Sequence, residues 1–256
     1  MENLKRNVEE LYRNVRGEMW KMRHTLLKWL HLMIPLLGIL VFLSYYSFSG
    51  WSDQGKVYGY MEVLSIVLPL IVSVVSAMSV ELEEKGHFQA LFTVTVYKRS
   101  PLIAKWMVLW SMGFAAILLA VLGFGVCFGI QTGRTVLSVG EYLVLAVVLW
   151  LGSMNLYLLH LFLNLAFSKT ISLCMGTVQL AVSALFLTGL GEGRWQFFPC
   201  AWGGRWSGYL LQYWKGNESV SGEYVANSLV VGAVVTILFW CGALLWFHYY
   251  EGRAVK

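Results

Sequence analysis

Long apolar runs alternate with short polar segments along the whole chain. Each of six runs has close to the roughly 20 residues that a helix needs to cross a bilayer core of about 30 Å. We place these runs at 26–48, 58–80, 105–130, 141–167, 170–190 and 226–250. Only Ser168–Thr170 separates the fourth run from the fifth, which predicts a tight helical hairpin. The pattern predicts an all-α integral membrane protein with six transmembrane helices in a single domain, 1–256.

The segment 1–25 has a different pattern, because charged residues dominate it. Its apolar residues recur at helical spacing on one face: Leu4, Val8, Leu11, Val15, Met19 and Met22. A basic amphipathic helix next to a membrane span is expected to lie along the membrane surface. An ordinary solvated helix remains an open alternative.

Composition agrees with a lipid-facing bundle. Hydrophobic residues make up 58% of the chain and charged residues 13%, against about 25% charged in a typical soluble domain. The net charge of +5 could indicate a nucleic-acid partner, but the basic residues lie at the ends of the apolar runs. We therefore interpret them as a topology signal and expect no nucleic-acid partner.

The basic residues also predict an orientation. With the N-terminus inside, fourteen of the 19 Lys and Arg residues lie in cytoplasmic segments. The other five lie outside: Lys56, Arg134, Arg194, Arg205 and Lys215. This bias predicts a multi-pass protein of the plasma membrane with both termini in the cytoplasm. It places the stretch 81–104 inside and the aromatic-rich stretch 191–225 outside.

The cytoplasmic stretch 81–104 combines three features. Acidic residues begin it, a short apolar piece with Phe88, Leu91 and Phe92 on one side follows, and basic residues with Pro101 end it. Such a helix is too short to cross the membrane, and its apolar face predicts docking in a protein groove. A simple helix at the membrane interface is the alternative.

This pattern resembles the coupling helix of type-2 ABC transporter permeases, which follows their second span. The matching residues are Glu81, Glu83, Glu84, Gly86, Phe88, Gln89, Leu91, Lys98 or Arg99, and Lys105. Together with His87 and Phe92, the residues from Glu81 to Phe92 are the candidates for contact with an ATPase. The family often has Pro where this chain has 94–96.

Two further segments are similar to the lantibiotic-immunity branch of these permeases. The segment 18–35 resembles its elbow helix and first span, and 195–205 resembles an aromatic–Pro–aromatic stretch before the last span. The resemblance covers essentially the whole chain and implies a six-span ABC-2 (type V exporter-like) topology.

The resemblance also implies a function. The chain would be one permease of a bacterial exporter that expels a lantibiotic or similar amphipathic antimicrobial peptide for self-immunity. Its partners would be a second permease, in a heterodimer or a homodimer, and an ABC ATPase dimer. The chain contains no G-x-x-x-x-G-K-[ST] sequence, so ATP and Mg are expected on the partner ATPase and no cofactor in this chain.

Polar and aromatic residues outside the coupling stretch supply two more sets of candidates. Those expected to face a cationic peptide are Glu62, Trp195, Phe198, Trp202, Arg205 and Trp206. The alternatives are an anchoring belt with a re-entrant helix for the aromatic residues, and capping of Lys56 or Tyr58 for Glu62. Within the spans, Asn155, His160, Asn164 and Gln179 are expected to form interhelical hydrogen bonds.

Other functional classes have little support in the sequence. Glu83-Glu84 begins an E-E-x-x-x-R-like protease signature, but Phe88 occupies the Arg position, and no H-E-x-x-H is present. The five His residues show no metal-ligand spacing within one span. We therefore expect neither an enzyme nor a metal site. Export of another amphiphile, such as a drug or lipid, and a non-transporting scaffold or sensor remain alternative functions.

Overall fold

The computed structural model describes residues 2–86, 88, 91, 97–216 and 222–251, and every regular element among them is helical. The elements are α1 (Glu2–Arg23), α2 (Leu27–Phe48), α3 (Asp53–Glu84), α5 (Ser100–Thr132), α6 (Val139–Gly152), α7 (Met154–Ala166), α8 (Lys169–Phe186), the 3-10 turns η1 (Gly189–Gly191) and η2 (Trp195–Phe197), α9 (Pro199–Trp214) and α10 (Gly222–Tyr249).

The expectation of six spanning helices is confirmed for the described part of the chain. The helices long and apolar enough to cross a membrane are α2, α3, α5, α6 with α7, α8 and α10. Several begin at a serine: the side chains of Ser52, Ser138 and Ser168 each accept a hydrogen bond from a backbone N–H in the first turn. Such caps satisfy donors that a helix start leaves free, so they fix where these spans begin.

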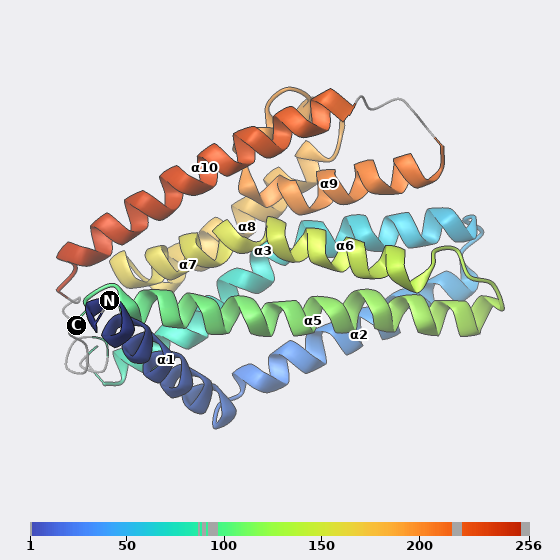
Figure 1. The fold of residues 1–256 in the computed structure, drawn as a ribbon. Coiled ribbons are helices and arrows are strands. Elements are labelled where there is room, and N and C mark those ends of the chain that lie inside the picture. The colour runs from blue at the N-terminus through green and yellow to red at the C-terminus, as the bar shows by residue number, and fades with distance from the viewer. Residues whose placement is uncertain (1, 87, 89–90, 92–96, 217–221, 252–256) are drawn as a thin grey trace.

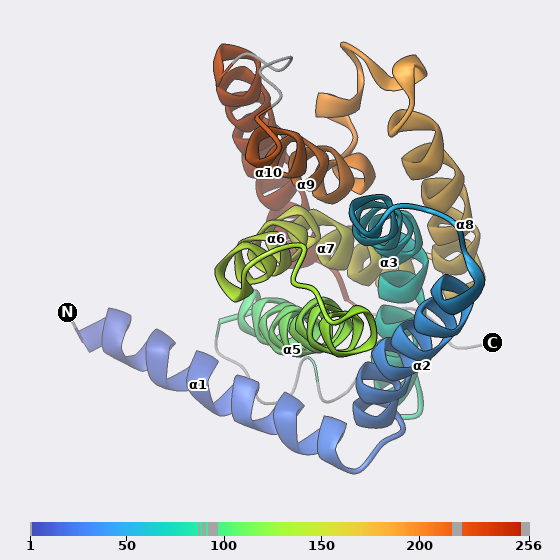
Figure 2. The ribbon, with the colours of Figure 1, turned by 90° about the vertical axis from the view of Figure 1, so that its right-hand side faces the viewer.

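The helices form an elongated bundle with two distinct ends (Figure 1). We call the end that holds α1 and the end of α10 the terminal end, and the opposite end the distal end. The α2–α3 and α5–α6 connections lie at the distal end, and α1 crosses the terminal end obliquely. A view along the bundle shows α1 running out to one side below α5 (Figure 2). The arrangement of α1 is that of a helix lying across the bundle, not one of its spans.

The fourth span is broken at Ser153, between α6 and α7. Near this break, a Cβ added at Gly152 would lie 2.8 Å from the backbone nitrogen of Gly203 in α9. Only a residue without a side chain permits so close an approach of two backbones. The break therefore lies where α9 packs closely against the span.

The stretch 191–225, expected to be an external aromatic loop, is largely helical. It contains η2 and α9, and α9 packs against α3, α6 and α8 at the distal end. Ala201, Gly203 and Gly204 are buried in this contact. A short helix folded back into the bundle, close to the re-entrant alternative, describes this segment better than a loop does.

Candidate functional site

A row of polar side chains joins α1 to the rest of the protein. Glu10, Asn14, Glu18 and Lys21 recur at three- or four-residue spacing and therefore share one face of the helix. The Glu10 carboxylate accepts a hydrogen bond from the backbone N–H of Tyr97 at 3.1 Å. The amide of Asn14 donates to Ser100 Oγ at 2.8 Å. These two bonds join α1 to the chain just before and at the start of α5.

Glu18 and Lys21 of this row form a cluster of four charged side chains with Glu83 of α3 and Lys105 of α5. We call it the charge cluster. Lys105 Nζ donates to Glu18 Oε2 at 2.6 Å and to Glu83 Oε1 at 2.9 Å. Lys21 Nζ bridges the same two carboxylates, at 2.7 Å each. Two positive and two negative groups thus alternate, and the cluster has no net charge.

Most of the charge cluster is buried. The side chains of Lys105 and Glu83 are 1% and 2% exposed, and that of Lys21 is 32% exposed. Lys105 also lies within 3.3 Å of Ser79 Oγ, which adds a third acceptor. Buried charges persist only when they are paired and hydrogen-bonded, so α1, α3 and α5 must keep this alignment for the cluster to exist.

The cluster also raises the pKa of Lys21. Burial by itself lowers the pKa of this lysine, but the Glu18 and Glu83 carboxylates act in the opposite direction and leave the pKa above its ordinary value of 10.5. Lys21 therefore stays positively charged at any physiological pH and continues to balance the two acids.

The candidate ATPase-contacting residues fall into three environments. Glu83 belongs to the charge cluster, and Glu81 lies 3.8 Å from Lys169 in a half-exposed ion pair. Glu84 is the last residue of α3, and the backbone N–H of Gly86 donates to the Glu83 carbonyl at 3.0 Å. His87, Gln89 and Phe92 lie outside the described residues.

Phe88 and Leu91 lie differently from our expectation. Both side chains are buried in the main hydrophobic core of this chain, so in this structure the chain itself supplies the groove that receives them. Phe88 has a φ of 58°, a conformation that a bulky residue seldom adopts. Its backbone N–H donates to Glu83 O at 2.9 Å. This bond ties Phe88 to a residue of the charge cluster.

At the distal end a second buried charge, Arg205, is held mainly by backbone carbonyls. Its guanidinium donates to Phe186 O at 2.6 Å, to Thr188 O at 2.7 Å and to the Glu192 carboxylate at 2.6 Å. We call this group the distal arginine site. Phe186 is the last residue of α8, where a helix leaves acceptors unpaired, and Thr188 follows two residues later, so Arg205 of α9 caps the end of α8.

Aromatic residues surround the distal arginine site. Trp195 is fully buried and donates to Tyr224 Oη at 3.0 Å, and Tyr224 donates in turn to Glu192 at 3.0 Å. Trp202 is also buried, and its indole donates to Gln196 O at 2.9 Å. The expectation that Trp195 and Trp202 present their rings to a peptide is therefore wrong for this conformation.

The other residues expected to face a substrate remain accessible in part. Phe198 is exposed and Trp206 is half-buried. Glu62 and Arg205 both line a cavity of about 100 Å³ between α3 and α9, which we call the distal cavity. Tyr58 donates to Leu211 O at 2.8 Å, so its hydroxyl is not capped by Glu62. Glu62 itself is exposed.

The expectation of interhelical hydrogen bonds among the intramembrane polar residues is confirmed. His160 of α7 lies 2.9 Å from both Ser172 Oγ and Gln179 Oε1 of α8. Asn164 donates to Ser172 Oγ at 2.9 Å, and Asn155 donates to Thr236 Oγ1 of α10 at 2.8 Å. These bonds join α7 to its two neighbours, so they have a structural explanation and need no substrate.

Sequence analysis did not identify the charge cluster as a site. The signals were the i, i+4 spacing of Glu10, Asn14 and Glu18, and a lysine, Lys105, at the start of an apolar run. Ionisable residues in such runs usually have a partner, but the sequence does not show which acids pair with Lys105. Among the described residues no group of His, Cys, Asp or Glu side chains could hold a metal ion.

Comparison with family models, with curated proteins and with solved structures gave no match to this chain. A function is therefore inferred from the geometry of the charge cluster and of the distal cavity.

Proposed function

We propose that this chain is a permease subunit of a type-2 ABC exporter that expels a lantibiotic or similar antimicrobial peptide from the membrane. In this proposal the terminal end faces the cytoplasm, because most Lys and Arg residues belong to segments at that end. The stretch 81–104 then faces an ATPase, and the distal cavity faces the outer surface of a bacterial membrane.

The charge cluster is the observation that carries this proposal. Glu83 lies near the start of the stretch 81–104 that would contact the ATPase, and Lys105 lies directly after it. Both are bonded to Glu18 or Lys21 of α1. A displacement of the connecting stretch would therefore move α1, α3 and α5 together, since tightly packed elements shift as units between discrete positions.

The proposed division of labour follows from the sequence. Without a P-loop, this chain would take its energy from a partner that binds ATP and Mg. A second permease, identical or related, would complete the pore. The outer faces of α2 and α10 carry exposed apolar residues, such as Leu40 and Leu238, which suit contact with lipid or with that subunit.

Glu62 is the residue that we propose meets the peptide. Its exposed carboxylate lies at the distal cavity, and a cationic peptide arriving from outside would be attracted to it. Arg205 lines the same cavity, but its guanidinium already donates to three acceptors. In this proposal it shapes the cavity wall and does not bind the peptide.

The ATPase assignment is tested by photo-crosslinking in the native cell. A photoreactive amino acid replaces Lys98, which is exposed at the terminal end, or Lys215, which is exposed at the distal end. We expect position 98, and not 215, to crosslink a protein that a photoreactive ATP analogue also labels. Absence of an ATP-labelled adduct at position 98 would contradict the coupling assignment.

The peptide assignment is tested by tolerance of cells to a cationic lantibiotic. Glu62→Gln removes the charge at the distal cavity, whereas Asp53→Asn removes a nearby helix-start charge outside the cavity lining. We expect Glu62→Gln to lower the tolerated concentration at equal membrane levels and Asp53→Asn to leave it unchanged. Equal tolerance of both variants and the wild type would remove Glu62 from the mechanism.

A further inference from the structure

A narrow cavity, which we call the lateral cavity, lies between α2, α3 and α5. Its volume is about 160 Å³, and its walls are apolar except at His31, Tyr60 and Tyr157. It is lined on α3 by residues from Tyr60 to Val75, a stretch that extends along the helix for about 22 Å at 1.5 Å per residue. A small volume distributed over such a length suits an extended chain and not a compact ligand.

Small residues open this cavity. Gly38, Gly113, Ala116 and Ala120 all line it. A Cβ added at Gly38 would meet nothing within 4 Å, whereas at Gly113 it would lie 2.2 Å from the Tyr157 hydroxyl. Val63, which is exposed, also belongs to the wall. The cavity therefore reaches the lipid-facing surface, from which an apolar chain can enter.

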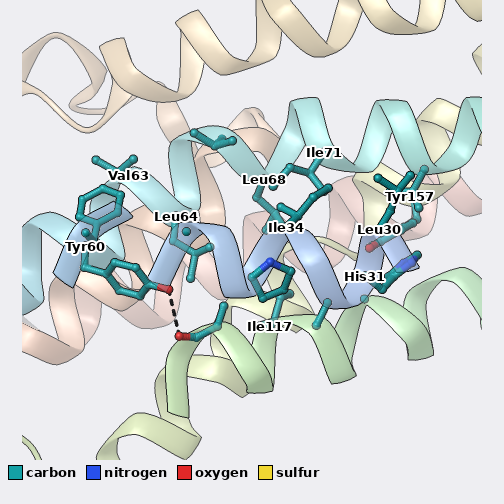
Figure 3. A pocket seen from close by; sticks show the side chains of 18 residues that line it. Leu30, His31, Ile34, Tyr60, Val63, Leu64, Leu68, Ile71, Ile117 and Tyr157 are labelled. Carbon is teal, nitrogen blue, oxygen red and sulfur yellow. Dashed lines mark hydrogen bonds between the residues drawn. The ribbon is translucent and has the colours of Figure 1, made fainter. Parts of the chain in front are cut away.

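One end of the cavity is polar. Figure 3 shows His31 and Tyr157 at this end and Tyr60 at the other, with Leu64 and Leu68 between them. Tyr60 is satisfied, because its hydroxyl donates to Ala120 O at 2.9 Å. No hydrogen bond of the Tyr157 hydroxyl is found within the described residues. The polar end thus has capacity for hydrogen bonding that the protein itself does not use.

His31 defines what this end can bind. Its Nδ1 lies 2.8 Å from Leu27 O, and since a carbonyl only accepts, Nδ1 carries the hydrogen. Its Nε2 is buried and has no partner in the described part of the chain. In so apolar a setting the uncharged ring is the stable form, so Nε2 presents a lone pair and needs a donor. Buried polar atoms are seldom left unpaired, which indicates an occupant.

We propose that the lateral cavity binds a single-chain amphiphile whose alkyl chain carries a hydroxyl group at its polar end. The enclosed part of the alkyl chain extends from the polar end toward Tyr60. The hydroxyl donates to His31 Nε2 and can accept from the Tyr157 hydroxyl. An engineered cavity of about 150 Å³ holds benzene, so only a short stretch of the alkyl chain is enclosed and the rest extends into lipid. This inference does not depend on the proposed export function.

The test uses the purified chain in detergent and two probes. One is a long-chain primary alcohol with a diazirine in its chain, and the other is the methyl ether of that alcohol. We expect the alcohol to label peptides of α2, α3 and α5 that line the lateral cavity. The ether cannot donate a hydrogen bond, so its labelling at equal concentration should be about three- to tenfold weaker.

Matched variants separate the cavity from the general lipid surface. Gly38→Leu fills the cavity, and Gly242→Leu adds the same side chain to an exposed position of α10. We expect Gly38→Leu to lose most of the labelling and Gly242→Leu to keep it. Ala116→Leu fills the cavity from α5 and replaces Gly38→Leu if that variant elutes as an aggregate. His31→Leu should keep the labelling but remove the preference for the alcohol.

Two results would overturn the proposal. Equal labelling of the cavity-filling variants and Gly242→Leu would show that the probe binds the lipid surface only. Equal labelling of the wild type by alcohol and ether would show an ordinary lipid chain that makes no use of His31. Neither readout involves ATP or transport, so failure here leaves the proposed function standing, and failure of the crosslinking experiment leaves the lateral cavity standing.

Discussion

The two ends of the bundle bury charge in opposite ways. At the terminal end, four side chains pair with one another, and two of the four bonds link residues 62 and 87 positions apart in the sequence. At the distal end, Arg205 is bound mainly by backbone carbonyls, and the linked residues are only 13 to 19 positions apart. The charge cluster thus fixes helices that are distant in sequence, whereas the distal arginine site closes a local turn.

This difference bears on movement. In the charge cluster each lysine contacts both acids, so α1, α3 and α5 are joined and would move as one unit. The carbonyls at the distal end are fixed in the backbone, and the bonds of Arg205 join only α9 to the nearby end of α8 and to Glu192. We therefore expect concerted motion of three helices at the terminal end and a rigid local turn at the distal end.

The largest effect is expected for Lys105→Met. The change leaves Glu18 and Glu83 with Lys21 as their only cation in the cluster, and removal of one partner of a buried ion pair costs about 3–5 kcal/mol. The unfolding free energy in mixed micelles measures it. Lys169→Met, which breaks the exposed pair with Glu81, is the control and should cost less than about 1 kcal/mol. Similar losses for the two variants would contradict the central place of the cluster.

Arg205→Met should have the next largest effect. It removes three hydrogen bonds from a charged donor and leaves the Thr188 carbonyl with only the Gly191 N–H as a donor, at a cost of about 2 kcal/mol. Arg205→Lys should recover little, because an ammonium cannot reproduce the planar fork. Thermal unfolding together with limited proteolysis near 188–198 reports the loss. A full rescue by lysine would show that charge alone, and not the geometry, holds this turn.

A smaller loss is expected for Tyr224→Phe. The variant keeps the ring but removes the acceptor of the Trp195 indole and a donor to Glu192, so we expect a loss of about 1 kcal/mol. Quenching of tryptophan fluorescence measures whether Trp195 becomes accessible. Tyr249→Phe, at an exposed position of α10, is the matched control, and an equal effect of the two changes would remove Tyr224 from the distal site.

The smallest effect concerns pH. The folded pKa of Lys21 is raised above 10.5, so its contribution to stability is fully present below that pH and is lost as the pH rises through the folded value. Unfolding followed from pH 9 upward should show stability falling above about pH 10.5. Lys21→Met should flatten part of this slope. An identical slope in the variant would mean that other groups account for the alkaline loss.

The sequence predicted much of the fold, because the length of an apolar run is a local property. The run at 26–48 matches α2 (Leu27–Phe48) closely, and the hairpin at Ser168 lies between α7 and α8. Asn155, His160 and Asn164 were expected to bond neighbouring helices, and they do. In these cases the composition of one segment is enough to determine its environment.

Long-range packing could not be predicted in the same way. Phe88 and Leu91 have the pattern of an amphipathic helix, but whether such a face docks on its own chain or on a partner depends on space that other helices leave. Trp195 and Trp202 similarly suggested a surface belt, because aromatic residues are common both there and in cores. The pairing of Lys105 with Glu18 required the direction of α1, which no local pattern specifies.

The position of Lys105 has a consequence for biosynthesis. A lysine inside an apolar helix is costly to place in a bilayer until it is neutralised. Both acids that contact it, Glu18 and Glu83, precede it in the chain, and chains fold from the N-terminus as they are made. When α5 leaves the ribosome, its counter-charges have therefore already been synthesised. The charge cluster can therefore form as soon as α5 has been made, without any of the helices that follow it.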